Sequence, residues 1–169
     1  RQPSMTAPAP APSTPDGEAI WSTHYEHPLP WGTEFAPLSM PAMFAASVAQ
    51  HGPAKMLDFL GRTYSFDAVA DAVRRAAKGL QAMGVGPGDR VGLFLPNVPH
   101  YVAAYYGALL AGATVVNFSP LYTVDELRHQ VEDSGTRLMV TLSAAALLPT
   151  ALKVLDGSSL DRLVVGSVA

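Results

Sequence analysis

Residues 84–120 constrain the fold of this chain more than any other stretch. They contain two short apolar runs, 91–95 and 114–118, and neither alternates cleanly with polar residues, which is typical of strands covered on both faces of a sheet. The segment between them is apolar nearly all round, so we expect a largely buried helix there. Its large side chains are Val98, Tyr101, Val102, Tyr105, Leu109 and Leu110. Because parallel neighbours need a crossover connection, the stretch predicts one parallel strand–helix–strand unit.

The preceding part of the chain predicts two helices and a hairpin. Residues 41–51 carry apolar side chains at helical spacing, with Pro41 suited to a first turn and Gly52 to a stop. Residues 55–59 and 62–64 flank Leu60-Gly61, which predicts a tight antiparallel hairpin. A longer helix follows Ser65 as its N-cap and ends at Gly84. Its apolar positions follow i, i+3, i+4 spacing throughout: Phe66, Val69, Ala70, Val73, Ala76, Ala77, Leu80 and Met83.

Helices and strands continue to alternate after residue 120. Thr123 and Glu126 have the spacing of a capping box, which predicts a helix that starts there and closes at Gly135. Residues 138–142 form a third buried run, 144–155 predict a helix that Pro149 shortens or kinks, and 160–165 predict a last strand. The expected fold class is α/β: a parallel, doubly wound sheet built from βαβ units with right-handed connections, and a small antiparallel hairpin.

The remaining sequence divides into a leader and an arm. Residues 1–17 are rich in proline and alanine, which predicts a disordered leader. Residues 18–40 combine several prolines with large aromatic side chains. The prolines disfavour a helix. The aromatic side chains favour burial, so we expect an aromatic arm packed across the surface. Residues 41–169 form the α/β domain. With 49% apolar residues, this chain can bury a core of its own.

Composition excludes several classes of function. The chain has no cysteine, which removes disulfides, thiolate metal ligands and cysteine nucleophiles. Its formal net charge of −3 gives no sign of a nucleic-acid partner. No apolar run approaches the roughly 20 residues that a transmembrane helix needs. We therefore expect a cytoplasmic protein, with a peripheral position at the inner membrane face as the alternative.

Several local patterns suggest chemistry, and each has a structural explanation. The glycine run at 84–88 has the composition of a phosphate loop, but it follows a helix and opens a strand, which is the wrong order. Asn97, in a loop of the right order, is predicted to be an N-cap. His24, Glu26 and His27 are close in sequence but form an incomplete metal ligand set, and Ser134 at a helix end has no histidine that could activate it. We therefore assign no catalytic residue and no metal ligand.

Ligands of open α/β sheets bind beyond the carboxyl ends of the strands. The loops there are predicted at 95–97, 117–123 and 142–145, and the second is the longest and most polar.

Six motifs, in this order and spacing, resemble the beginning of the adenylate-forming acyl-CoA synthetase superfamily. They are Gly61-Arg62-Thr63-Tyr64-Ser65-Phe66, Gly84-Val85-Gly86-Pro87-Gly88-Asp89-Arg90-Val91, Leu95-Pro96-Asn97, Leu110-Ala111-Gly112-Ala113, Asn117-Phe118-Ser119-Pro120-Leu121-Tyr122 and Glu132-Asp133-Ser134-Gly135. Trp21, Tyr25 and Pro28 further resemble the leader of long-chain fatty acid–CoA ligases. The resemblance spans about residues 21–165.

This resemblance implies an enzyme that activates a fatty acid with ATP and Mg²⁺ and transfers the acyl group to coenzyme A. A homodimer is a further implication, because long-chain relatives often dimerise through this region. The family's phosphate loop with Pro-Lys-Gly, its aromatic-Gly-x-Thr-Glu segment, its ribose-binding Asp and its catalytic Lys are not in this sequence. We therefore interpret the chain as an N-terminal fragment of a longer enzyme, or as a naturally truncated relative, that is inactive alone. The alternative is a non-catalytic doubly wound module for binding or dimerisation.

One binding site can be transferred by resemblance. In related short-chain synthetases the loop after the second strand lies near the coenzyme A nucleotide, and it aligns with Ser119, Pro120, Leu121 and Tyr122. This chain lacks the glycine pair found there, and residues 143–147 lack the arginines that those relatives direct at the CoA phosphate. The alternative is a loop that only begins the following helix through its capping box.

Overall fold

The computed structural model describes residues 20–24, 26, 28–29 and 32–167. The chain divides into two units, Arg1–Pro37 and Leu38–Ala169. The first contains one short 3-10 helix, η1, over Ile20–His24. The second contains α1 Met40–His51, β1 Lys55–Phe59, β2 Arg62–Ser65, α2 Phe66–Ala82, β3 Arg90–Phe94, α3 Pro99–Leu110, β4 Thr114–Phe118, α4 Val124–Ser134, β5 Leu138–Leu142, α5 Leu148–Asp156 and β6 Arg162–Gly166.

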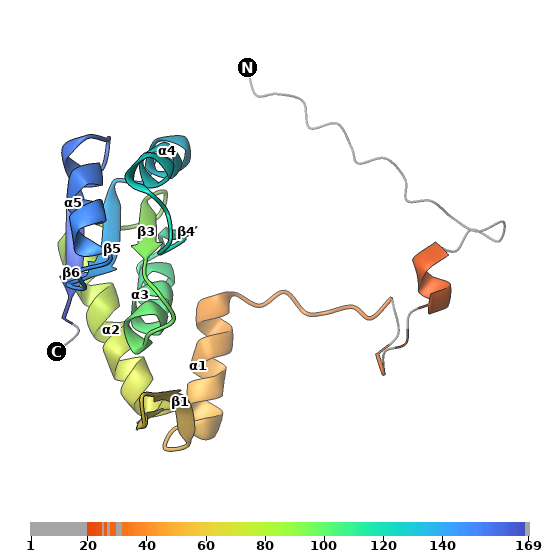
Figure 1. Ribbon diagram of the computed structural model, residues 1–169. Coiled ribbons are helices and arrows are strands. Elements are labelled where there is room, and N and C mark those ends of the chain that lie inside the picture. The colour runs from red at the N-terminus through yellow and green to blue at the C-terminus, as the bar shows by residue number, and fades with distance from the viewer. Residues whose placement is uncertain (1–19, 25, 27, 30–31, 168–169) are drawn as a thin grey trace. The chain divides into compact units, whose positions relative to one another are not determined.

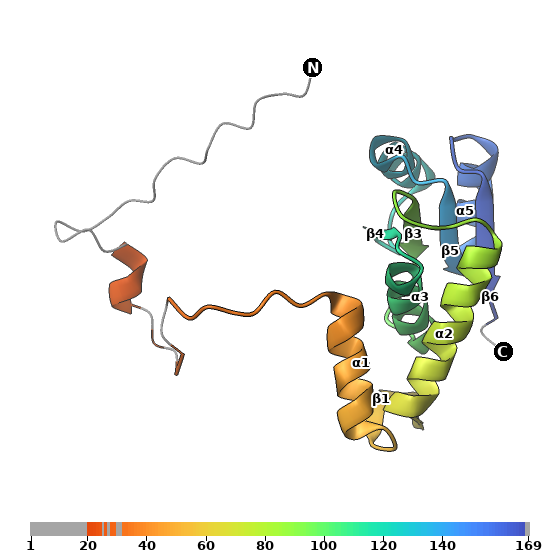
Figure 2. The same ribbon diagram turned by 180° about the vertical axis from the view of Figure 1, so that it is seen from behind.

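The predicted α/β class is confirmed, with a four-stranded parallel sheet in the order β4-β3-β5-β6. The helices α2 and α3 pack together on one face of the sheet, and α4 and α5 pack on the other (Figures 1 and 2). The chain leaves β3 toward β4 on one side and later returns to β5 on the other side of β3. The sheet is therefore doubly wound, and its strand order reverses between β3 and β5.

The predicted hairpin is also present, as an antiparallel pair of β1 and β2. Its turn residues Leu60 and Gly61 both have positive φ, 52° and 79°. Two consecutive positive φ values define the tight type I′ turn, whose twist matches that of paired strands.

Most helix boundaries follow from capping residues that the sequence predicts. The Ser65 hydroxyl accepts a 3.1 Å hydrogen bond from the Ala68 amide at the start of α2. Gly84, with φ of 82°, follows the end of α2, and Gly135, with φ of 64°, closes α4. These positions need a left-handed backbone, which glycine adopts without strain.

The structure modifies the expectation that α3 is largely buried. Its buried residues are the small ones, Ala104, Gly107 and Ala108, whereas Leu110 is 47% exposed. The cause is the close approach of α2, whose backbone lies against Gly107. Several of the large α3 side chains are half-buried: Tyr101 and Tyr105 pack against the main core, and Val102 and Tyr106 pack against a second, smaller one.

Two other boundaries differ from the sequence prediction. The helix α5 begins at Leu148, four residues later than expected, because Pro149 fits only the first turn of a helix. The 3-10 helix over Ile20–His24 was not predicted, and it forms ahead of the first proline of the arm, Pro28. The predicted leader at residues 1–17 lies outside the described residues. No helix within the described ranges is long and apolar enough to cross a membrane.

Candidate functional site

Three loops leave the carboxyl ends of the parallel strands, as the sequence predicts. They follow β3 at residues 95–98, β4 at 119–123 and β5 at 143–147. The first leads to α3 on one face of the sheet and the third to α5 on the opposite face (Figures 1 and 2). Open α/β sheets bind ligands at this edge, so it is the candidate site of this domain.

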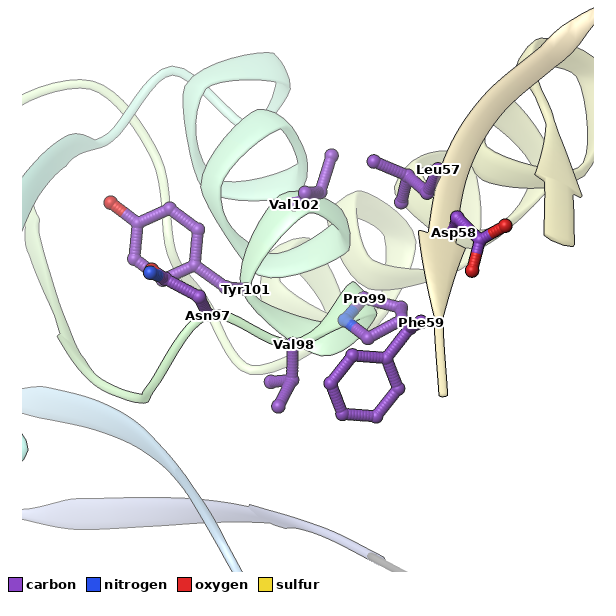
Figure 3. Close-up of a pocket in the computed structure, with 8 residues that line it drawn as sticks. All are labelled: Leu57, Asp58, Phe59, Asn97, Val98, Pro99, Tyr101 and Val102. Atoms are coloured by element: carbon purple, nitrogen blue, oxygen red, sulfur yellow. The ribbon is translucent and has the colours of Figure 1, made fainter. Parts of the chain in front are cut away.

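A pocket of about 210 Å³ lies beside the first of these loops, between β1 and the start of α3. Leu57 and Phe59 of the hairpin face Val98, Pro99 and Val102, while the Asp58 carboxylate points away from them (Figure 3). The lining is mainly apolar, and its polar members are Asp58, Asn97 and Tyr101. The pocket suits a small apolar group held near a few hydrogen-bonding atoms.

Asn97 is not the N-cap that the sequence predicted. The cap position is Val98, which has extended backbone angles and makes no side-chain capping bond. Pro99 in the first turn has no amide hydrogen to be satisfied, so this helix start has less need of a polar cap. The Asn97 side chain instead lines the pocket.

A hydrogen bond joins the start of α3 to the end of β4. The Tyr101 hydroxyl donates to Asn117 Oδ1 at 2.9 Å. Burial raises the pKa of Tyr101, and the neighbouring Tyr105 adds to the rise, so the phenol stays protonated and available as a donor. Sequence reasoning missed this pair, because the two residues are joined only by the crossing of α3 over the sheet.

The predicted coenzyme A loop forms a tight turn after β4. The Tyr122 amide donates to the Ser119 carbonyl at 3.1 Å, and Pro120 occupies the second position of this turn. The Leu121 amide donates to Ser119 Oγ at 3.3 Å, and the Leu121 side chain is 89% exposed. Tyr122 packs against the core. The turn therefore presents Leu121 outward while Tyr122 anchors it.

The capping box that follows this turn is present in full. The Thr123 amide donates to Glu126 Oε2 at 2.8 Å, and the Glu126 amide donates to Thr123 Oγ1 at 3.4 Å. The bond from the Thr123 amide is the main reason that the pKa of Glu126 is lowered. Both Glu126 and Thr123 are thus engaged in starting α4. Their polar atoms are therefore engaged within the capping box.

The glycine run at 84–88 lies where the sequence argument placed it, between α2 and β3. The Gly86 amide donates to Asp89 Oδ2 at 2.8 Å, so the side chain of the residue directly after the run occupies this donor. Ser134 donates to the Gln130 carbonyl at 2.6 Å and lies 2.8 Å from Thr136 Oγ1, so its hydroxyl belongs to the end of α4. Both motifs have structural partners.

Within the part of the chain that the structure describes, no three His, Cys, Asp or Glu residues gather as a metal ligand set. Tyr25 and His27 of the histidine-rich segment lie outside the described residues. The loop after β3, which has the right order for binding phosphate, contains no glycine. No catalytic step is derived from these residues.

Fold and loops together define a doubly wound α/β domain with its ligand edge at β3, β4 and β5. Residues 44–166 match the family model described as AMP-binding enzyme. The chain belongs to the AMP-binding enzyme family.

Curated relatives agree with this assignment. The chain is 34% identical over 149 residues to a long-chain-fatty-acid–CoA ligase of Bacillus subtilis, an alignment that covers 88% of this chain and 26% of the relative. A long-chain-fatty-acid–CoA ligase of Escherichia coli is 35% identical over 150 residues, covering 86% of this chain and 26% of its own length. The chain therefore spans about a quarter of these relatives.

Solved structures share the fold. A long-chain-fatty-acid-CoA ligase from Archaeoglobus fulgidus superimposes with a TM-score of 0.71 at 23% identity, covering 83% of this chain and 30% of that one. A benzoate CoA ligase from Burkholderia xenovorans gives a TM-score of 0.70 at 20% identity, covering 77% and 26%. The family model and the curated ligases confirm the sequence resemblance to acyl-CoA synthetases.

Proposed function

We propose that this chain is the N-terminal part of a long-chain fatty acid–CoA ligase. The complete enzyme would convert a fatty acid, ATP and CoA to acyl-CoA, AMP and pyrophosphate, through an acyl-adenylate whose carbonyl is then attacked by the CoA thiol. Adenylation joins the carboxylate to the α-phosphate and releases pyrophosphate, and thioester formation releases AMP. Mg²⁺ would neutralise the phosphates, as is usual for ATP-dependent enzymes.

The observation that carries this proposal is the similarity to curated long-chain ligases over nearly the whole α/β domain. In the proposal, residues 41–169 supply scaffold and one edge of the ligand site, and the adenylating groups belong to sequence beyond this chain. The Ser/Thr/Gly-rich phosphate loop is expected downstream, because the loops described here leave the phosphates without glycine-rich amides.

The isolated chain is expected to be inactive, whereas the chain extended through the missing motifs is expected to be active. ATP–pyrophosphate exchange with a long-chain fatty acid measures the first half-reaction directly, because labelled pyrophosphate enters ATP only through a reversible adenylate. We expect exchange for the longer protein and none above background for residues 1–169. Exchange by the 169-residue chain would contradict the proposed division of labour. A longer protein that folds but shows no exchange with any fatty acid would contradict the proposed ligase function.

We further propose that the turn formed by Ser119, Pro120, Leu121 and Tyr122 borders the nucleotide of coenzyme A. Its support is the position at the carboxyl end of β4, the outward side chain of Leu121 and the alignment with short-chain synthetases. Its polar atoms are few, so the turn would contribute shape and apolar contact, with phosphate-binding cations supplied by other parts of the enzyme.

A charge at Leu121 tests this turn in the longer enzyme. Leu121→Glu places a carboxylate next to the CoA phosphates, and we expect the KM for CoA to rise about tenfold, the effect of roughly 1.4 kcal/mol of like-charge repulsion. ATP–pyrophosphate exchange, which does not involve CoA, should be unchanged. Leu60→Glu is the matched control, because Leu60 is 91% exposed at the hairpin tip. Equal KM values for CoA in the two variants would contradict the proposal that this turn borders the CoA nucleotide.

A further inference from the structure

The helices α1, α2 and α3 line an apolar groove that lies apart from the loops at the carboxyl ends of the strands. Its volume is about 350 Å³. Each helix contributes one face: Pro41, Phe44, Ala45, Val48 and Ala49 from α1, Ala70, Val73 and Arg74 from α2, and Tyr106 and Leu110 from α3. It shares no lining residue with the pocket beside the loop after β3.

The base of the groove is formed by buried residues, and its sides are open to solvent. Phe44, Ala70 and Val73 are buried at 8%, 3% and 2% exposure and form a small hydrophobic core of their own. Phe44 stacks on Tyr106, with ring centroids 4.3 Å apart, which fixes both rings. Two of the α1 residues that line the groove above this floor, Ala45 and Ala49, have side chains too short to fill it.

Arg74 supplies the charge at this groove. It is the one charged residue among those that line it, and its side chain is 58% exposed, so the guanidinium lies at the mouth. Asp71 on the same helix forms an ion pair with it. An exposed ion pair of this kind is weak. Because a guanidinium has five N–H donors, Arg74 can also donate hydrogen bonds to a second carboxylate.

We propose that this groove binds a single-chain carboxylate amphiphile, with the alkyl chain along the alanines of α1 and the carboxylate at Arg74. The combination of an apolar trough and one cation at its mouth matches such a molecule in both shape and charge. A bilayer surface fits less well, because interfacial helices typically carry Lys or Arg on their polar face and α1 carries none. The groove is also concave, as a single chain requires.

Binding of decanoate, below the concentration at which it forms micelles, tests the proposal on the 169-residue chain. Titration calorimetry should show saturable one-to-one binding, weaker for octanoate by about fourfold per methylene removed. Ala45→Leu fills the trough and should reduce decanoate affinity at least tenfold. Ala46→Leu is the matched control: Ala46 is exposed on the same helix and does not line the groove, so its affinity should be unchanged.

The charge at the mouth is tested separately with decanol as a neutral analogue. Arg74→Gln should weaken decanoate several-fold and leave decanol unchanged, whereas Asp71→Asn should strengthen decanoate by removing the competing carboxylate. Equal loss in Ala45→Leu and Ala46→Leu, or equal effects of Arg74→Gln on both ligands, would overturn the proposal. So would binding only to anionic vesicles and never to monomeric decanoate. Circular dichroism of each variant confirms that it is folded.

Discussion

Replacing Leu127 with alanine is expected to lower the free energy of unfolding by about 2–5 kcal/mol, the range for buried leucines whose removal leaves a cavity. Leu127 is 0% exposed and lies on α4, the helix that carries the chain from β4 past β3 to β5. Its side chain belongs to the main core. The loss is expected in the upper part of this range, because the main core around Leu127 is packed and leaves neighbouring side chains little room to fill the cavity.

Leu152 provides the matched control. It lies on α5, which packs beside α4 on the same face of the sheet, but its side chain is 50% exposed (Figure 1). Leu152→Ala should cost less than about 1 kcal/mol, since much of the removed surface was already in water. Urea denaturation followed by circular dichroism gives both values. Equal losses for the two variants would show that α4 does not seal the core as the structure indicates.

Much of the fold could be predicted because its signals are local. Ser65, Thr123 and Gly135 act within one turn of their own helix, so their capping role can be read from spacing alone. The parallel order of elements follows equally directly from buried runs separated by helical ones. These are the features that the structure confirms.

The candidate site was harder to predict, because it depends on residues that only the tertiary fold brings together. Tyr101 and Asn117 meet across the β3–α3–β4 crossover, and the hairpin residues Leu57 and Phe59 meet the start of α3. A pocket formed between separate elements leaves no spacing pattern in one sequence. The wrong expectation for Asn97 has the same origin: the polar side chain suggested a cap, but the helix start is set by Pro99. The placement of the turn at 119–122 beside CoA remains a prediction.

The burial of α3 leads to Gly107. Apolarity all round the helix predicted that α3 is largely buried, but its fully buried residues are the small ones, Ala104, Gly107 and Ala108. A Cβ at Gly107 would lie 2.7 Å from the Ala76 Cβ, 3.2 Å from the Ala77 amide nitrogen and 3.3 Å from the Val73 carbonyl oxygen. The helices α2 and α3 can therefore approach closely only because residue 107 has no side chain.

Gly107→Val is accordingly expected to destabilise the protein by about 3 kcal/mol, the upper end of the usual cost of overpacking. The nearest atoms are backbone atoms and an alanine Cβ, none of which can rotate away, so α2 and α3 would have to separate. Gly79→Val is the matched control, since Gly79 is also inside a helix and nothing lies within 4 Å of its Cβ position. Valine slightly exceeds glycine in helix propensity, so this variant should stay within about 0.5 kcal/mol of the parent. Chemical denaturation of both variants decides the matter: a Gly107→Val protein as stable as Gly79→Val would mean that the two helices do not meet at residue 107.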